Sequence, residues 1–309
     1  MSRIAFIKNS LEYLPEIEIY KDYFSNLGLQ VSIVEHPEDI LNADIYWFFM
    51  GVEHKKKVSG LHIHEYASLS TPPYGIVKDK IKRLINIVPD GRVFLNETIK
   101  QKAFFNDHVP FTYRDMGVSE HFFRKNNNIT KEYDFVYIGS LSAKRNIRKL
   151  LQCFSEKYYQ YTLLVIGECP NDLYNDFKAF PNIIFSGRLN YKDIPALACK
   201  AKCGINYTPN IYPYKYQTST KVLEYLAMGL NVCSTRIEWV ESFAKNKKID
   251  NIQFFNESLI DFRPEDYLSN GEYWAHIKEY NWDKIMDKAN LLNFIHSIIK
   301  NRRIDEHSK

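Results

Sequence analysis

Short apolar runs alternate with amphipathic stretches along the chain, and this alternation predicts an α/β protein. The first series predicts strands at 3–8, 31–35, 44–50 and 92–95, and helices at 15–28 and 76–87. The run 45–50 is continuously apolar, which is typical of a parallel strand that helices cover on both faces.

A polar, Asn-rich stretch at 124–133 separates this series from a second one and predicts a linker. The second series predicts strands at 135–138, 161–167, 183–185, 204–207 and 231–234, and helices at 147–154, 220–228 and 282–302. We therefore expect two Rossmann-like, doubly wound domains that face a cleft, residues 1–125 and 126–280.

Composition narrows the class of protein. A chain of 309 residues suits two domains, and no apolar stretch approaches the ~20 residues of a bilayer span. The first apolar run is too short for a signal peptide. The net charge of +4 permits an anionic small ligand or contact with an anionic membrane, but it does not indicate nucleic acid. Five cysteines without a Cys-x-x-Cys pair indicate reduced thiols in a cytoplasmic protein and no metal site.

Thr218, Ser219 and Thr220 lie where a helix is expected to begin. Their hydroxyls are suited to cap the helix, and the N–H groups at its start are suited to bind phosphate. Lys221 and Glu224 are three residues apart and share a face of this helix. Spacing alone favours the simpler interpretation, a capped helix with solvated charges.

A second segment runs from a strand into the turn Gly139-Ser140-Leu141. The basic residues Lys144, Arg145 and Arg148 follow, where a diphosphate would be gripped. The segment is neither a Walker A loop nor a Gly-x-Gly-x-x-Gly fingerprint, and basic helix starts are often merely solvated.

Together these motifs resemble the nucleotide-sugar-binding domain of GT-B glycosyltransferases, in the retaining family 4 group of bacterial surface-polysaccharide type. The resemblance rests on Gly139-Ser-Leu with Arg145 at the position of the family's Lys, and on the runs 163–168, 182–188, 224–232 and 280–285. Ser140 replaces an Arg of the pattern, and Tyr216 replaces the first of two paired glutamates. The pattern Ser/Thr-x-Lys-x-x-Glu-Tyr of some relatives fits residues 219–225.

The resemblance implies a role for each matching residue. Glu224 would bind the ribose, and Arg145 with Lys144 would neutralise the leaving diphosphate. His64, in a loop after a central strand, would be the cleft histidine, with His62 in reserve; a core or surface histidine pair is an equal alternative. The remaining residues expected to contact the donor are Gly139, Ser140, Arg188 near the base, Tyr216 and Gln217 at the sugar, and Thr218, Ser219, Thr220 and Lys221 at the helix start.

The implied activity is retaining transfer of a hexosyl group from a nucleotide diphosphate sugar to a glycan or lipid-linked acceptor, without metal or cofactor. The implied fold also returns the C-terminal helix, 281–309, to the first domain. Two other functions stay open, a nucleotide-sugar epimerase of GT-B fold and a non-catalytic binder of nucleotide sugar or glycan. Basic clusters at 54–57 and 78–83 are typical of solvated faces, or would contact anionic lipid at the inner face of the membrane.

Overall fold

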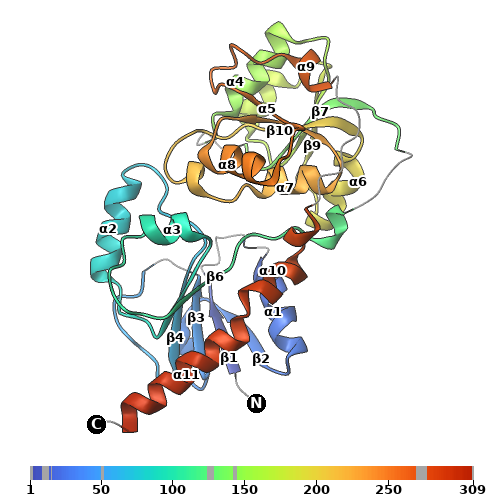
Figure 1. Cartoon of the computed structure of the whole chain (residues 1–309). Helices are drawn as coiled ribbons and strands as arrows, with labels where there is room; N and C mark the ends of the chain where they lie inside the picture. The colour runs from blue at the N-terminus through green and yellow to red at the C-terminus, as the bar shows by residue number, and fades with distance from the viewer. Residues whose placement is uncertain are drawn as a thin grey trace. The chain divides into compact units, whose positions relative to one another are not determined.

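The computed structural model describes residues 3–8, 14, 16–49, 52–123, 129–141, 145–268 and 277–307, with side chains as far as 302 (Figure 1). The chain forms two compact units, residues 1–116 with 282–309, and residues 117–281. The division at Gly117 lies ahead of the linker expected at 124–133. Val118 already belongs to unit 2, where it pairs with Asn281. None of the described helices is both long and apolar enough to cross a bilayer.

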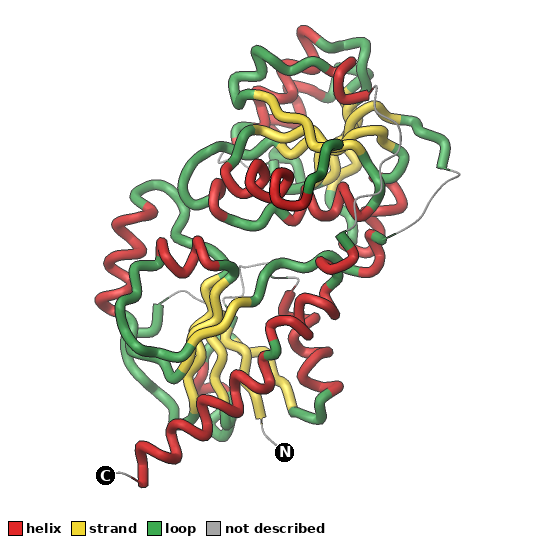
Figure 2. The backbone as a smooth tube through the Cα atoms, viewed as in Figure 1, coloured by secondary structure: helices red, strands yellow, loops and turns green. Residues whose placement is uncertain are grey.

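The described part of unit 1 is built on a parallel sheet of six strands in the order β2-β1-β3-β4-β5-β6, shown in yellow in Figure 2. The strands are β1 (Arg3–Ile7), β2 (Gln30–Val34), β3 (Ile45–Phe49), β4 (Leu61–Tyr66), β5 (Gly91–Phe94) and β6 (Phe111–Tyr113). The connecting helices are α1 (Glu16–Asn26), α2 (Gly75–Ile85) and α3 (Glu97–Lys102). The apolar run expected to be buried on both faces is β3, whose five residues are all buried.

The C-terminal helices α10 (Trp282–Ala289) and α11 (Leu291–His307) return to unit 1, which confirms the predicted crossover (Figure 1). Ile298 and Phe294 of α11 lie so close over Gly91 of β5 that a Cβ there would clash with both. The single helix expected at 282–302 is wrong in one respect, because Asn290 has φ 46° and separates two helices.

Unit 2 has a second parallel sheet, whose described strands follow the order β12-β11-β10-β7-β8-β9. The strands are β7 (Tyr133–Ile138), β8 (Leu163–Ile166), β9 (Ile183–Gly187), β10 (Ala201–Asn206), β11 (Asn231–Thr235) and β12 (Ile252–Phe255). The helices are α4 (Ile147–Gln152), α5 (Asn171–Phe177), α6 (Ile194–Ala198), α7 (Thr220–Ala227), α8 (Glu238–Lys247) and α9 (Pro264–Leu268). The predicted fold class, two Rossmann-like α/β domains of GT-B type, is confirmed.

Candidate functional site

The carboxyl ends of β7, β8 and β9 meet at one edge of the unit 2 sheet, where two glycines allow a close approach. Gly139 follows β7 with φ 135°, and a Cβ on it would lie 2.8 Å from Cε of Lys221. Gly167 follows β8, and a Cβ on it would clash with the carbonyl oxygen of Gly139. A side chain at Gly139 would therefore push apart the loop after β7 and the first turn of α7, and one at Gly167 would push apart the loops after β7 and β8.

Lys221 is held at this edge by an aromatic hydroxyl. Its Nζ donates to Tyr137 Oη at 3.1 Å and lies 4.3 Å from the centre of the Tyr137 ring. Burial lowers the pKa of Lys221 to about 7, and the charge of Arg145 adds to this effect, while Glu224 opposes it. Two cations thus share a small region, which an anion would stabilise.

Glu224 lies one turn further along α7 and is only 6% exposed. Its Oε1 accepts a hydrogen bond of 2.7 Å from the hydroxyl of Tyr191. Burial raises the pKa of Glu224 to about 7, although Tyr191 and Lys221 both favour the carboxylate. Lys221 and Glu224 lie three residues apart on α7, as predicted, but Glu224 is buried and Lys221 is half-buried, so neither charge is fully solvated.

Ser219 stands at the N-cap of α7, but its side chain does not cap the helix. Its Oγ instead donates to Oδ1 of Asn206, at 3.4 Å, at the end of β10. The expectation that this hydroxyl caps the helix is therefore wrong, because the buried Asn206 takes the hydroxyl into a network that also contains Thr208. The positive end of the α7 dipole stays directed at the region beside Lys221.

The other predicted donor residues lie around the same edge. The guanidinium of Arg145 lies 4.2 Å from the centre of the Tyr214 ring. Tyr214 is the first residue of a short 3₁₀ helix that ends at Tyr216. Arg188, after β9, forms an exposed ion pair with Glu168, after β8, at 4.0 Å. Gly139 and Ser140 lie in the loop after β7, Gln217 and Thr218 in the approach to α7, and Thr220 is the first residue of α7; Lys144 falls outside the described residues.

Tyr137 and Tyr191 were not predicted from the sequence, although Tyr137 accepts a hydrogen bond from Lys221 and Tyr191 donates one to Glu224. A signal existed for Tyr137, because it lies two residues before Gly139 and strand residues two apart share a face. Tyr191 follows β9 by only a few residues, and its contact with Glu224 depends on the fold alone.

In unit 1, His64 is in a strand rather than in the predicted loop, since 61–66 forms β4. Its Nε2 lies 2.6 Å from one oxygen of Glu53, and Nδ1 of His62 lies 2.8 Å from the other. Burial lowers the pKa of His64. Burial would raise the pKa of Glu53, but the two histidines outweigh this and lower it. This is the environment of a core histidine pair, and a catalytic role for His64 stays a prediction.

The opposite face of β4 carries a buried ionic network. Glu65 forms an ion pair with Arg114, whose Nε donates to Tyr20 at 2.8 Å. Glu65 also accepts from the Tyr20 hydroxyl at 2.9 Å and from the Trp47 indole at 2.8 Å. Arg114 is therefore charge-paired within the core of unit 1.

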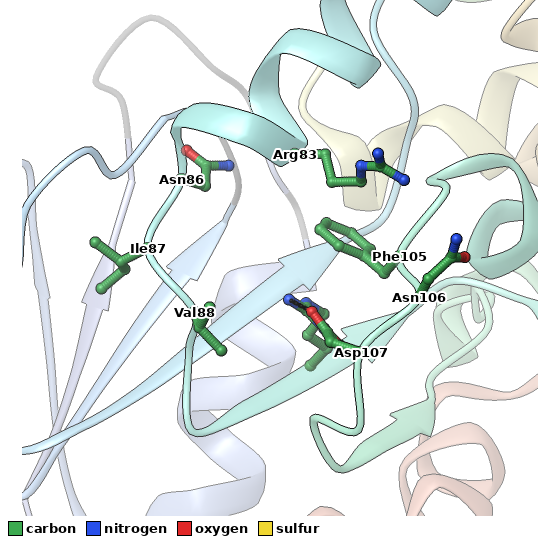
Figure 3. Close-up of a pocket in the computed structure, with 8 residues that line it drawn as sticks. Arg83, Asn86, Ile87, Val88, Phe105, Asn106 and Asp107 are labelled. Atoms are coloured by element: carbon green, nitrogen blue, oxygen red, sulfur yellow. Dashed lines mark hydrogen bonds and ion pairs between the residues drawn. The ribbon is translucent and has the colours of Figure 1, made fainter.

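A cavity of about 250 Å³ lies elsewhere in unit 1 (Figure 3). It is lined by the end of α2 with the chain after it, by β5 and by the loop after α3. In the cavity wall, Arg92 donates two hydrogen bonds to Asp107, and its guanidinium lies 3.9 Å from the centre of the Phe105 ring. The cavity contains none of the predicted site residues. Among the described residues, no three His, Cys, Asp or Glu side chains gather as metal ligands would.

The sequence of residues 118–280, just over half of the chain, matches the model of the family "Glycosyl transferases group 1". The chain belongs to this family of glycosyltransferases. The match covers nearly all of unit 2, including the edge that carries Lys221 and Glu224. No curated protein matches the sequence significantly.

Solved structures similar to this glycosyltransferase share its fold at low sequence identity. AviGT4, a glycosyltransferase involved in avilamycin A biosynthesis, has 11% identity and a TM-score of 0.64, over 97% of this chain and 99% of its own. Sucrose-phosphate synthase from Thermosynechococcus elongatus has 10% identity and a TM-score of 0.64 over the whole of both chains. Anabaena Alr3699/HepE, crystallised with UDP and glucose, has 10% identity and a TM-score of 0.62, over 98% of this chain and 100% of its own.

Proposed function

We propose that this glycosyltransferase moves a hexosyl group, with retention of configuration, from a nucleotide diphosphate sugar to a glycan or lipid-linked acceptor. The observation that carries the proposal is the convergence of Arg145, Lys221 and Glu224 at the start of α7. Arg145 and Lys221 repel each other in the empty protein, and a diphosphate between them would turn this repulsion into attraction.

Each group then has a definite role toward the donor. The cations and the positive end of α7 bind the diphosphate and stabilise the charge that grows on it as the sugar leaves. Glu224 accepts hydrogen bonds from the ribose hydroxyls in the place now taken by Tyr191. Gly139 leaves room for the donor beside the loop after β7. The charge on these residues replaces a metal ion, so we propose a metal-independent reaction.

Retention follows when the acceptor attacks the face of the sugar that the diphosphate leaves. The acceptor oxygen forms a bond to the anomeric carbon while the bond from that carbon to the phosphate oxygen breaks. The acceptor's proton passes to a phosphate oxygen, and the products are a glycoside and the nucleoside diphosphate. This step needs no carboxylate nucleophile, which agrees with Tyr216 in place of the first family glutamate.

We further propose an acceptor in surface-polysaccharide synthesis, presented at the inner face of a membrane. The basic cluster 54–57 supports this choice, because an acceptor linked to lipid diphosphate carries negative charge. UDP sugars are the first donors to test, because a similar fold was crystallised with UDP-glucose.

The test incubates the full chain with a panel of nucleotide sugars, with and without a lipid extract, and measures nucleoside diphosphate and product mass. Release that requires the extract supports transfer. Conversion of a donor without the extract would show an epimerase, and binding without conversion would show a non-catalytic binder. Lys221→Met should abolish release, whereas the matched surface variant Lys178→Gln should leave release unchanged.

A further inference from the structure

Helix α2 of unit 1 differs from an ordinary surface helix, because its polar side faces the protein and its apolar side is exposed. Its protein-facing positions are polar or small: Gly75 and Asp79 are buried, and Lys82 is half-buried. The Asp79 carboxylate accepts from the Ser70 amide at 3.0 and 3.1 Å. Just beyond the helix, Oδ1 of Asn86 accepts from the Glu53 amide at 2.8 Å. Hydrogen bonds, rather than an apolar stripe, therefore attach α2 to unit 1.

The apolar side chains of α2 point outward. Val77, Ile81 and Leu84 recur at helical spacing on the side away from Asp79, where Leu84 is 76% exposed, and Val88, in the chain after the helix, is 71% exposed. Among the described residues, seven of the 17 exposed large hydrophobic side chains fall within residues 74–88: Tyr74, Ile76, Val77, Ile81, Leu84, Ile85 and Val88. We call these seven the α2 face, and α2 itself stands at the outer side of unit 1 in Figure 1.

Cations flank the α2 face. At about 100° per residue, Lys78 and Lys80 project on opposite sides of the apolar stripe. Lys78 and Arg83 reach backbone carbonyls of Thr71 and Phe104, so their stems stay close to the helix. Residues 74–88 hold four basic side chains and one acidic side chain, and the acidic one, Asp79, is buried. The exposed charge within residues 74–88 is therefore wholly positive, and the nearby carboxylate of Asp107 is paired with Arg92.

We propose that the α2 face docks on the surface of an anionic lipid bilayer. An outward apolar stripe between two rows of cations matches the boundary between acyl chains and anionic head groups. A second protein would explain the exposed apolar side chains, but not the cations on both sides of them. The inference rests on the membrane contact of the proposed function and assigns it to a surface, and it does not depend on the transfer chemistry.

The experiment is flotation of the full chain with vesicles of phosphatidylcholine alone, or of phosphatidylcholine with phosphatidylglycerol. We expect binding only to the anionic vesicles, and weaker binding in high salt. Ile81→Ser with Leu84→Ser should weaken binding at least tenfold. Lys78→Gln with Lys80→Gln should weaken it about 25-fold, from a factor of about five for each cation.

Ile260→Ser is the matched control, because Ile260 is 82% exposed but lies in unit 2. This variant should bind vesicles as the unchanged protein does. All variants should keep their UDP affinity, which reports on the proposed donor site separately. Equal binding to both kinds of vesicle, or no binding to either, would overturn the inference without affecting the proposed transfer. A dimer in light scattering that Leu84→Ser abolishes would assign the α2 face to a second copy instead.

Discussion

Nucleotide binding should depend on pH through Lys221. Burial and the nearby charge of Arg145 lower its pKa to about 7, so the free protein carries this charge on about half of its molecules at pH 7. A bound diphosphate would hold the side chain protonated, because its negative charge offsets both effects. Binding above pH 7 must then take up a proton, and affinity must fall as pH rises.

The expected size follows from the fraction of free protein that carries the charged lysine. That fraction falls from about one half at pH 7 to about 3% at pH 8.5, which alone would raise Kd roughly 15-fold. Over the same range Glu224, whose pKa is also about 7, becomes fully ionised and offsets a factor of about two, so Kd should rise about eightfold, or about 1.2 kcal/mol. Calorimetry with UDP in two buffers of different ionisation enthalpy measures both Kd and proton uptake, which should approach one proton at pH 8.5.

Three controls isolate the cause. Uridine has no diphosphate, so its affinity should be nearly independent of pH over this range. Lys221→Met should bind UDP weakly at pH 7 and lose the pH dependence. Glu224→Gln should bind more weakly but keep the pH dependence. An unchanged Kd for UDP between pH 7 and 8.5, or an undiminished pH dependence in Lys221→Met, would refute the reasoning.

Four further predictions concern the donor site and the fold. Glu224→Gln should weaken UDP binding about tenfold to hundredfold, because a hydrogen bond to a charged group contributes about 1.5–3 kcal/mol; unchanged affinity in calorimetry would contradict the ribose role. Transfer should survive excess EDTA, because Arg145 and the α7 dipole supply the positive charge; loss of product that Mn²⁺ or Mg²⁺ restores would show a metal-bound diphosphate. Deleting residues 282–309 should lower the melting temperature, because α11 packs directly on Gly91, and Arg114→Met should cost about 3–5 kcal/mol by leaving Glu65 unpaired. An unchanged melting curve in either variant would contradict the structural role.

The sequence predicted the fold best where a pattern is local. The apolar run 45–50 and the segment around α7 both carry their own signal, and the predicted bounds of α7 lie within one residue of the structure. Strand β4 was missed because its sequence, Leu-His-Ile-His-Glu-Tyr, is polar at three of six positions. Those polar side chains are buried because Glu53, outside the strand, pairs with the two histidines and Arg114, 49 residues away, pairs with Glu65.

The candidate site shows the same limit. Lys221 and Glu224 were identified from a motif, but both of their pKa shifts come mainly from burial, and that of Lys221 also from Arg145, which only the folded chain brings near. Tyr191 was missed because its contact with Glu224 spans 33 residues. The break at Asn290 was missed because the apolar pattern continues on both sides of it, although Asn is one of the residues that can end a helix in the left-handed conformation.

The return of the C-terminal helices to unit 1 separates the order of synthesis from the order of folding. Unit 2 is complete once residue 281 has been made, whereas unit 1 is formed from both ends of the chain. Until α10 and α11 leave the ribosome, the nascent N-terminal part has no cover for Gly91 of β5 and no Trp282 beside Arg114. Unit 2, an insertion within unit 1, therefore completes its fold first, and the segment synthesised first is completed last.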